Sequence, residues 1–318
     1  MRRSVIAWII LPVLLALAGC GGGDSPAAGP PGPKDAPAAV SAQAAPQGDG
    51  SYRAPAFASS GFSAEYAVGN AQVLVDASSA QYGYVAVSGQ SEKRLKCQIF
   101  YGETTYTYDL PADGTPAVYP LQCGDGAYRL RVMENVVDNK YANLYSTEFD
   151  VALVDEFQPF LRPSSYVDYH EDSACVKMAG EFAAQADTAL DVVAAVYDWI
   201  CSNVAYDMEK AATVQSGYLP DPDETLETGR GICFDYASLA AAMLRSQGVP
   251  TKVIFGYVSP HDVYHAWNMF YTAETGWVTV GYEVKEGSWN RLDLTFSAGG
   301  ADIAYIGNGE AYADLYCY

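Results

Sequence analysis

The sequence predicts an α+β protein in which a small antiparallel β-sandwich precedes a mixed domain of helices and strands. Three observations predict this division. Residues 61–155 contain many short strand-like runs separated by turn signals, helical periodicity begins only after Asp172, and further strands follow a helix predicted over 234–247. The chain of 318 residues is long enough for two domains with their own hydrophobic cores.

The N-terminus has the pattern of an export signal. Met1-Arg2-Arg3 precedes an apolar run over 5–18, which is short for a membrane span. The run ends in Leu-Ala-Gly-Cys at 17–20, which resembles the lipobox of bacterial lipoproteins. That resemblance implies a signal peptide over 1–19, lipid on Cys20, and a location outside the cytoplasm, anchored to the bacterial cell membrane. An ordinary secretory signal with an incidental cysteine is the alternative.

Residues 20–60 are dominated by Gly, Ala, Pro, Ser and Gln. Such a segment buries too little apolar surface to offset its ordering entropy, so it is interpreted as a flexible tether. The chain has a formal charge of −20, with 18 basic against 38 acidic side chains. This charge argues against nucleic-acid binding, because phosphate contacts need lysine and arginine.

The β-sandwich is predicted over 61–155. Strand-like runs such as 71–75, 83–87 and 97–101 alternate with turn-forming sequences. Its tyrosines, among them Tyr101, Tyr106 and Tyr108, either form a binding face for carbohydrate or peptide or are simply strand residues with high β-propensity. Of these two interpretations, the second is favoured.

Helical patterns follow over 174–186 and 189–204, with apolar residues at helical spacing. A polar stretch over 208–228, rich in Pro, Asp, Glu and Gly, then precedes the next helix. We expect it on the surface, as a cleft wall or lid.

Cys233 is the candidate nucleophile. It follows two glycines and lies at the start of the helix predicted over 234–247. Unpaired backbone N–H groups and the helix dipole stabilise a thiolate at this position. Two strands come later in the chain: one carries His265 near its start, and the other carries Asp293. Adjacent strands would place these two side chains together, opposite Cys233.

The three segments are GICFDYASLAAAMLRSQGVPTKVIFGY, then YHAWN with a following GW, then RLDLTF. Together they resemble the core of the transglutaminase-like superfamily, which shares the papain-like arrangement. The resemblance implies a catalytic domain over 156–318, with Cys233 as nucleophile, His265 as general base and acid, and Asp293 orienting His265. Leu294 departs from the family, which usually has proline there.

Acyl transfer also requires an oxyanion hole. The backbone N–H of Cys233 is one expected donor, and the phenol of Tyr206 is the candidate for the second. A partly buried core tyrosine is the alternative for Tyr206.

The remaining cysteines permit several pairings. Cys97 with Cys123, and Cys175 with Cys201, are possible disulfides, and free thiols are the competing interpretation. His261 and His265 are four residues apart, but no ligand cluster completes a zinc site. The sequence therefore calls for no metal and no cofactor.

The predicted function is that of a cell-surface thiol enzyme. It would form a thioester from a protein or peptide amide and pass the acyl group to an amine or to water. Cell-wall peptides are one candidate class of substrate. The alternative is an adhesion or binding module that keeps this fold without catalysis.

Overall fold

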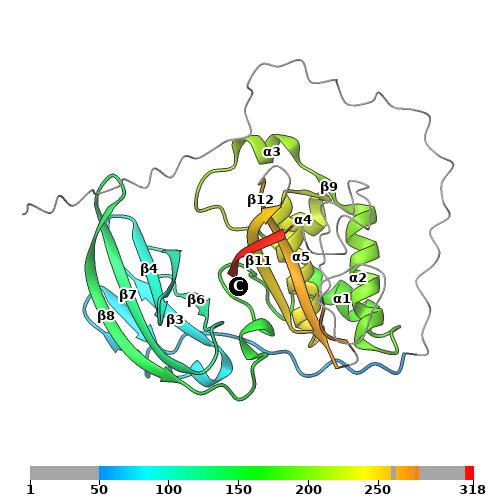
Figure 1. The fold of residues 1–318 in the computed structure, drawn as a ribbon, viewed down its shortest axis with the longest axis horizontal. Helices are drawn as coiled ribbons and strands as arrows, with labels where there is room; N and C mark the ends of the chain where they lie inside the picture. The colour runs from blue at the N-terminus through cyan, green and yellow to red at the C-terminus, as the bar shows by residue number, and fades with distance from the viewer. Residues whose placement is uncertain (1–49, 259–262, 274, 279–311) are drawn as a thin grey trace, which may run out of the picture.

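The computed structural model describes residues 50–258, 263–273, 275–278 and 312–318. Its first part contains two antiparallel four-stranded sheets, as the strand pattern predicts (Figure 1). One sheet has the order β1-β2-β3-β6, and the other has the order β5-β4-β7-β8. The strands are β1 (Val68–Gly69), β2 (Val73–Asp76), β3 (Tyr84–Gly89), β4 (Leu95–Tyr101), β5 (Thr104–Leu110), β6 (Ala117–Pro120), β7 (Gly126–Val137) and β8 (Lys140–Val151).

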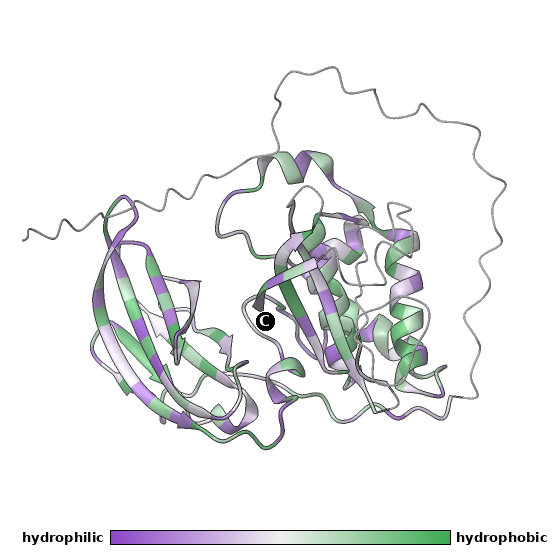
Figure 2. Ribbon diagram, in the orientation of Figure 1, coloured by the Kyte–Doolittle hydropathy of each residue, from purple (hydrophilic) through white to green (hydrophobic). Residues whose placement is uncertain are grey.

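The two sheets pack face to face and share one core. Val75 and Val87 of the first sheet lie in the same buried cluster as Ile99 of the second. The sheets approach each other closely at Gly89, because a Cβ there would lie 2.7 Å from Leu95 Cδ1. Figure 2 shows hydrophobic and hydrophilic residues alternating along β7 and β8, the period-2 pattern of strands with one buried face.

The tyrosines of this sandwich belong to its core. Tyr106 and Tyr108 are buried, and the Tyr108 ring lies 4.5 Å from that of Tyr119. Tyr101 packs on Tyr128 and donates a hydrogen bond to the Asp125 carbonyl at 2.8 Å. Tyr106 and Tyr108 are therefore buried strand residues, and Tyr101 is a partly exposed one that packs on Tyr128, in agreement with the favoured interpretation.

Among its described residues, the second part combines the helices α1 to α5 with a sheet of order β13-β12-β11-β14. The helical patterns over 174–186 and 189–204 correspond to α1 (Ala174–Ala183) and α2 (Ala189–Asn203). The other described elements of this part are η2 (Gln158–Phe160), β9 (Ala205–Tyr206), α3 (Met208–Thr213), α4 (Pro222–Thr228), β10 (Arg230–Gly231), α5 (Cys233–Ser246), β11 (Thr251–Val258), β12 (Val263–Thr272), β13 (Gly276–Val278) and β14 (Tyr312–Cys317). In the first part, η1 (Ala80–Tyr82) lies between β2 and β3.

Helix ends are stabilised by carboxylates from nearby segments. Thr188 and Asp191 form a capping box at α2: Asp191 N–H donates to Thr188 Oγ1, and Thr188 N–H donates to Asp191 Oδ2. At α1, the first two N–H groups donate to the carboxylate of Asp223, each at 2.9 Å. Since Asp223 belongs to α4, this cap ties α4 to α1.

Helix α5 is the centre of the second part. It packs against α1, α2 and α4 on one side and against β11 and β12 on the other (Figure 1). Every residue of α5 after Cys233 is buried. In the described part of the chain, no helix has the length and hydropathy that a membrane span requires.

The buried cation Arg245 holds the last turn of α5. Its guanidinium donates hydrogen bonds to three carbonyl oxygens, of Thr251 at 2.8 Å, Arg162 at 3.0 Å and Tyr318 at 3.1 Å. These carbonyls come from segments far apart in the sequence. Burial lowers the pKa of Arg245 to about 10, so the group remains charged at neutral pH.

Gly256 provides a test of the sheet packing. A Cβ at this position would lie 2.0 Å from the Ala313 carbonyl oxygen and 2.7 Å from Trp267 Cη2. We expect Gly256→Ala to lower the free energy of unfolding by roughly 1–3 kcal/mol, because strand β14 or the indole must move. Urea unfolding followed by tryptophan fluorescence measures the change.

Gly180→Ala is the matched control. Gly180 lies inside α1, and a Cβ there meets no atom within 4 Å. It should be neutral or stabilise the protein by up to about 1 kcal/mol through helix propensity. Equal stability of Gly256→Ala and the parent protein would contradict the described packing of β11 against β14.

Candidate active site

Cys233 opens helix α5, as the sequence predicts. Ile232 is the extended N-cap residue, and the predicted helix over 234–247 is observed over 233–246. The preceding turn depends on Gly229, whose φ of 60° ends α4 in the left-handed conformation. The Cys233 side chain is partly buried and free, and it lies where helix N–H groups favour an anion.

A fully buried carboxylate lies two residues after Cys233. Asp235 accepts a hydrogen bond from the Ile232 N–H at 2.7 Å, so it caps the first turn of α5. Gly231 makes room for it, because a Cβ at Gly231 would lie 2.5 Å from the Asp235 Cβ. The carboxylate is therefore part of the local structure that places Cys233.

The polar stretch over 208–228 supplies the partners of this carboxylate. Lys210 of α3 forms an ion pair with Asp235 at 3.0 Å, and the Tyr218 hydroxyl donates to Asp235 at 2.5 Å. Lys210 also lies 4.5 Å above the Tyr218 ring, a cation–π distance. The stretch predicted to be a cleft wall is thus fastened to the nucleophile helix by a buried charge network. Sequence reasoning missed these three residues, although Asp235 stands at the third helical position, where carboxylates cap helices.

Strand β12 carries His265 and packs against α5. It pairs antiparallel with β11, and His265 lies opposite Gly256. Asn268 connects the strand to the helix, because its Nδ2 donates to the Ala237 carbonyl at 2.9 Å. Near the start of α5, the Phe234 ring lies 4.8 Å from that of Phe255 on β11. The part of the sheet that contains His265 therefore adjoins the start of α5.

The register decides which side chains of β12 point toward α5. Successive residues of a strand alternate between its two faces. Asn268 contacts α5, so alternation places His265 on the opposite face, where its ring lies 6.2 Å from Trp267. Tyr264 lies on the same face of β12 as Asn268 and is half-exposed. Partial burial raises its pKa to about 12, and neighbouring groups, Cys233 among them, add to the rise. The structure thus brings β12 to Cys233 but places the His265 ring on the other face of the sheet.

Tyr206, the candidate oxyanion donor, lies beside the turn that leads to Cys233. Strands β9 and β10 pair in parallel, with Tyr206 next to Gly231. The Asp207 N–H donates to the Gly231 carbonyl at 2.9 Å, which fixes this pairing. Tyr206 is half-exposed. Its role as an oxyanion donor stays a prediction.

Two other candidate residues, Asp293 and Cys20, lie outside the described residues, as does His261. Within residues 50–258, 263–273, 275–278 and 312–318, no group of three His, Cys, Asp or Glu side chains is arranged to hold a metal ion.

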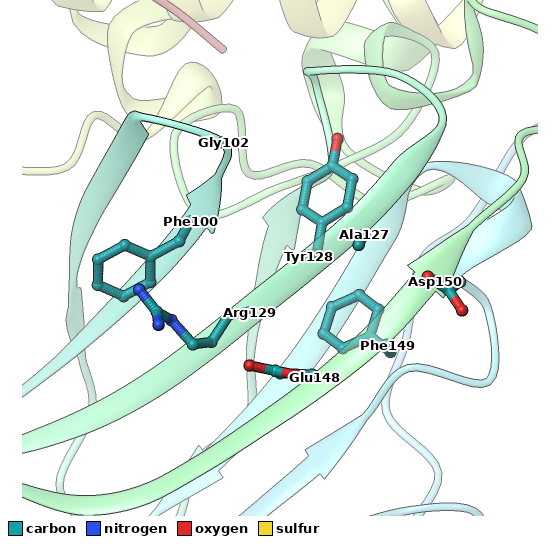
Figure 3. Close-up of a pocket in the computed structure, with 8 residues that line it drawn as sticks. All are labelled: Phe100, Gly102, Ala127, Tyr128, Arg129, Glu148, Phe149 and Asp150. Atoms are coloured by element: carbon teal, nitrogen blue, oxygen red, sulfur yellow. The ribbon is translucent and has the colours of Figure 1, made fainter.

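A separate pocket lies on the outer face of the sandwich. It has a volume of about 410 Å³ and is formed by β4, β7 and β8 (Figure 3). The Arg129 guanidinium lies 4.4 Å from the centre of the Phe100 ring, Glu148 is paired with Arg129 across the strands, and Asp150 lines the other end of the pocket. Its described lining contains no cysteine or histidine, so it is not the site of thiol chemistry.

A family model decides the class of the second part. The model described as the transglutaminase-like superfamily matches residues 176–282. These residues form a transglutaminase-like domain. The match includes α5 with Cys233 and β12 with His265. The fold class predicted from the sequence, a transglutaminase-like domain after a β-sandwich, is confirmed.

Similar proteins agree with this class but match only in part. The kyphoscoliosis peptidase of Mus musculus is 28% identical over 136 residues, which are 40% of this chain and 18% of the relative. The protein-glutamine gamma-glutamyltransferase of Pseudomonas aeruginosa is 32% identical over 124 residues, which are 35% of this chain and 17% of the relative. This chain therefore spans less than a fifth of either relative.

Among solved structures, red sea bream transglutaminase is similar with a TM-score of 0.26 and 15% identity. The similarity covers 61% of this chain and 47% of that chain.

The Lys210–Asp235 pair provides a test of how the polar stretch is fastened. Lys210→Met removes the cation but keeps most of the side-chain volume, and so leaves a buried carboxylate uncompensated. We expect the free energy of unfolding to fall by roughly 1–3 kcal/mol, measured by urea unfolding. The double variant Lys210→Met/Asp235→Asn should recover part of this loss.

Lys93→Met is the matched control. Lys93 pairs with Glu134 at 3.4 Å, but its side chain is 56% exposed. Exposed pairs are worth about 0–1 kcal/mol, so little should change. If the two lysine variants lost the same stability, the buried network would not fasten the stretch.

Proposed function

We propose that this protein is a cysteine-dependent acyl-transfer enzyme with Cys233 as its nucleophile. The observation that carries the proposal is the position of Cys233 at the N-terminus of a buried helix, within a domain of the transglutaminase-like superfamily. Attack of the Cys233 thiolate on a protein or peptide amide would give a thioester and release an amine. An amine or water would then take the acyl group. Two of the similar proteins are named for a peptidase and for a glutamyl transfer.

His265 is the proposed general base and acid, with Asp293 orienting it. Imidazole is the side chain that exchanges protons near neutral pH. Tyr264, on the α5 side of β12, is unsuited to this role because partial burial raises its pKa to about 12. The proposal requires the His265 ring to be on the α5 side of the sheet during the reaction.

We also propose where the protein is located in the cell. The end of the predicted tether packs on the mixed domain, where Tyr52 donates a hydrogen bond to the Gln247 carbonyl at 2.7 Å and Phe57 contacts Tyr169. With lipid on Cys20 and the earlier part of the tether after it, the enzyme would be held at the outer side of a bacterial membrane. Its substrates would then be proteins or peptides outside the cytoplasm, cell-wall peptides among them.

The rate of iodoacetamide labelling at Cys233 tests the nucleophile. Full-length protein is labelled over a range of pH, and the labelled site is identified by peptide mass spectrometry against Cys233→Ala. An activated thiolate should label fast well below the pKa of about 8.5 of a free thiol. His265→Ala should slow labelling at pH 7 about tenfold or more, because an ion pair with imidazolium lowers a thiol pKa.

Tyr264→Phe is the matched control for His265→Ala. It changes a β12 side chain on the α5 side of the sheet without removing a group that titrates near neutrality, so the pH profile should keep its shape. A profile of an ordinary thiol, indifferent to His265, would favour the alternative of a binding module without catalysis. A profile altered by Tyr264→Phe and not by His265→Ala would reassign the partner of Cys233.

A further inference from the structure

A buried ion pair adjoins the first turn of helix α5. Asp235 is completely buried, and Lys210 Nζ lies 3.0 Å from its Oδ2 and 3.1 Å from its Oδ1. The same carboxylate accepts hydrogen bonds from the Ile232 N–H and from the Tyr218 hydroxyl. In the part of the chain that the structure describes, Lys210 is the one cation within ion-pair distance of this carboxylate. The charge of Asp235 is therefore compensated from a different segment of the chain.

The carboxylate lies close to Cys233. Its Oδ2 is 2.7 Å from the backbone nitrogen of Ile232, the residue that precedes Cys233. Standard bond lengths and the spacing of consecutive Cα atoms then place Oδ2 within about 8 Å of the Cys233 Cα. Ile232 and Phe234, on either side of Cys233, are both buried. In such surroundings water screens a charge only in part, so the charge state of this ion pair acts on Cys233.

Two opposing electrostatic effects meet at this turn. The N-cap residue Ile232 has no side-chain acceptor, so it leaves the first N–H groups of the helix available to stabilise a thiolate at Cys233. A carboxylate nearby opposes the same thiolate, because two negative charges repel each other. Lys210 cancels the second effect by pairing with Asp235, and it leaves the first effect in place.

Other charged groups near this turn change the balance less. Arg230 of β10 forms an ion pair with Asp207 at 3.5 Å, so these two side chains add no net charge. Glu209 and Glu224 line a pocket of about 280 Å³ together with Lys210, but both carboxylates are exposed to solvent, which screens them.

The tyrosines around this turn carry no charge near neutral pH. Burial raises the pKa of Tyr166 and of Tyr264 to about 12, and it also raises the pKa of Tyr218. Tyr206 of β9 is a half-exposed phenol. His265 lies on the opposite face of β12. What the polar stretch adds to the charge at this turn is therefore the ammonium group on α3.

Several contacts hold Lys210 in place. Its backbone N–H donates to Asp207 Oδ1 at 2.9 Å, which caps α3. Its ammonium group lies 4.5 Å from the centre of the Tyr218 ring. Next to Tyr218, Gly217 lies against the sandwich, because a Cβ at Gly217 would lie 3.0 Å from Asp109 Oδ2 of β5. The position of this cation therefore depends on the polar stretch and on the sandwich that the stretch contacts.

We propose that Lys210 is a positioning residue for the reaction at Cys233: it compensates the charge of Asp235, so that the thiolate forms near neutral pH. Lys210 acts through Asp235 and does not touch the substrate. It follows that detaching the stretch 208–228 from α5 would make the nucleophile less reactive. This inference rests on the proposed role of Cys233 as the nucleophile.

The pH profile of iodoacetamide labelling at Cys233 tests this role in the full-length protein. Lys210→Met leaves the charge of Asp235 uncompensated, so the midpoint of the profile should move upward by about one pH unit. The midpoint is a better measure than the rate at one pH, because a less acidic thiol is also the better nucleophile once it is ionised.

The labelling has to be assigned to Cys233 by peptide mass spectrometry, because other thiols are present. The described cysteines are free, including both pairs that the sequence allowed as disulfides, Cys97–Cys123 and Cys175–Cys201. Burial raises the pKa of Cys97 and of Cys175, so these two should react slowly.

Three further variants make the test specific for charge. Lys210→Arg keeps the cation, so its midpoint should stay close to that of the parent protein. Asp235→Asn removes the carboxylate and should move the midpoint downward, which tests the proposal even if circular dichroism shows Lys210→Met to be unfolded. The double variant Lys210→Met/Asp235→Asn should return the midpoint close to that of the parent. Lys93→Met, in an exposed ion pair of the sandwich, is the matched control and should leave the profile unchanged.

A purely structural role of Lys210 gives a different result. It would scale the labelling rate by the same factor at every pH and leave the midpoint in place. Unchanged midpoints in Lys210→Met and in Asp235→Asn would overturn the inference. Failure of the proposed function is recognised separately, as a parent profile of an ordinary thiol that is indifferent to His265→Ala. Even such a thiol has a midpoint, so the effect of Lys210 is measured in either case.

Discussion

Burial of a charged helix is the constraint on which the rest of the structure depends. Helix α5 has no solvent-exposed side, yet it carries Asp235 in its first turn and Arg245 in its last. The two charges suit the helix dipole, negative near the N-terminus and positive near the C-terminus. Each would be very costly to bury without partners. The surrounding segments supply those partners, so they must take fixed positions around α5.

The two ends of α5 organise different parts of the molecule. At its start, Lys210 and Tyr218 fasten the polar stretch over 208–228 beside Cys233. At its end, Arg245 joins three backbone carbonyls, one of them next to Cys317. The nucleophile position and the interface with the sandwich are thus connected through one rigid element. Removing the charge of Asp235 or of Arg245 should therefore first disorder the segments attached to that end of α5.

The candidate chemistry depends on this arrangement in a specific way. A cysteine at a helix N-terminus is favoured as a thiolate, but a carboxylate two residues later disfavours a second negative charge nearby. Lys210 compensates the negative charge of Asp235, so the helix N–H groups can stabilise a negative charge at Cys233. Acyl transfer would then require only a proton carrier, which the proposal assigns to His265.

The sequence by itself determined what local patterns control. Alternation in the strands of the sandwich, helical periodicity in α1, α2 and α5, and the position of Cys233 at a helix start all follow from nearby residues. Tertiary structure alone decided which distant groups meet. Lys210 reaches Asp235 across 25 positions, and Arg245 reaches the Arg162 carbonyl across 83 positions. The pairing register of β12 against β11 likewise decides on which face of the sheet His265 lies. The sequence of one strand does not specify this register, and a shift of one residue would exchange the two faces of the strand.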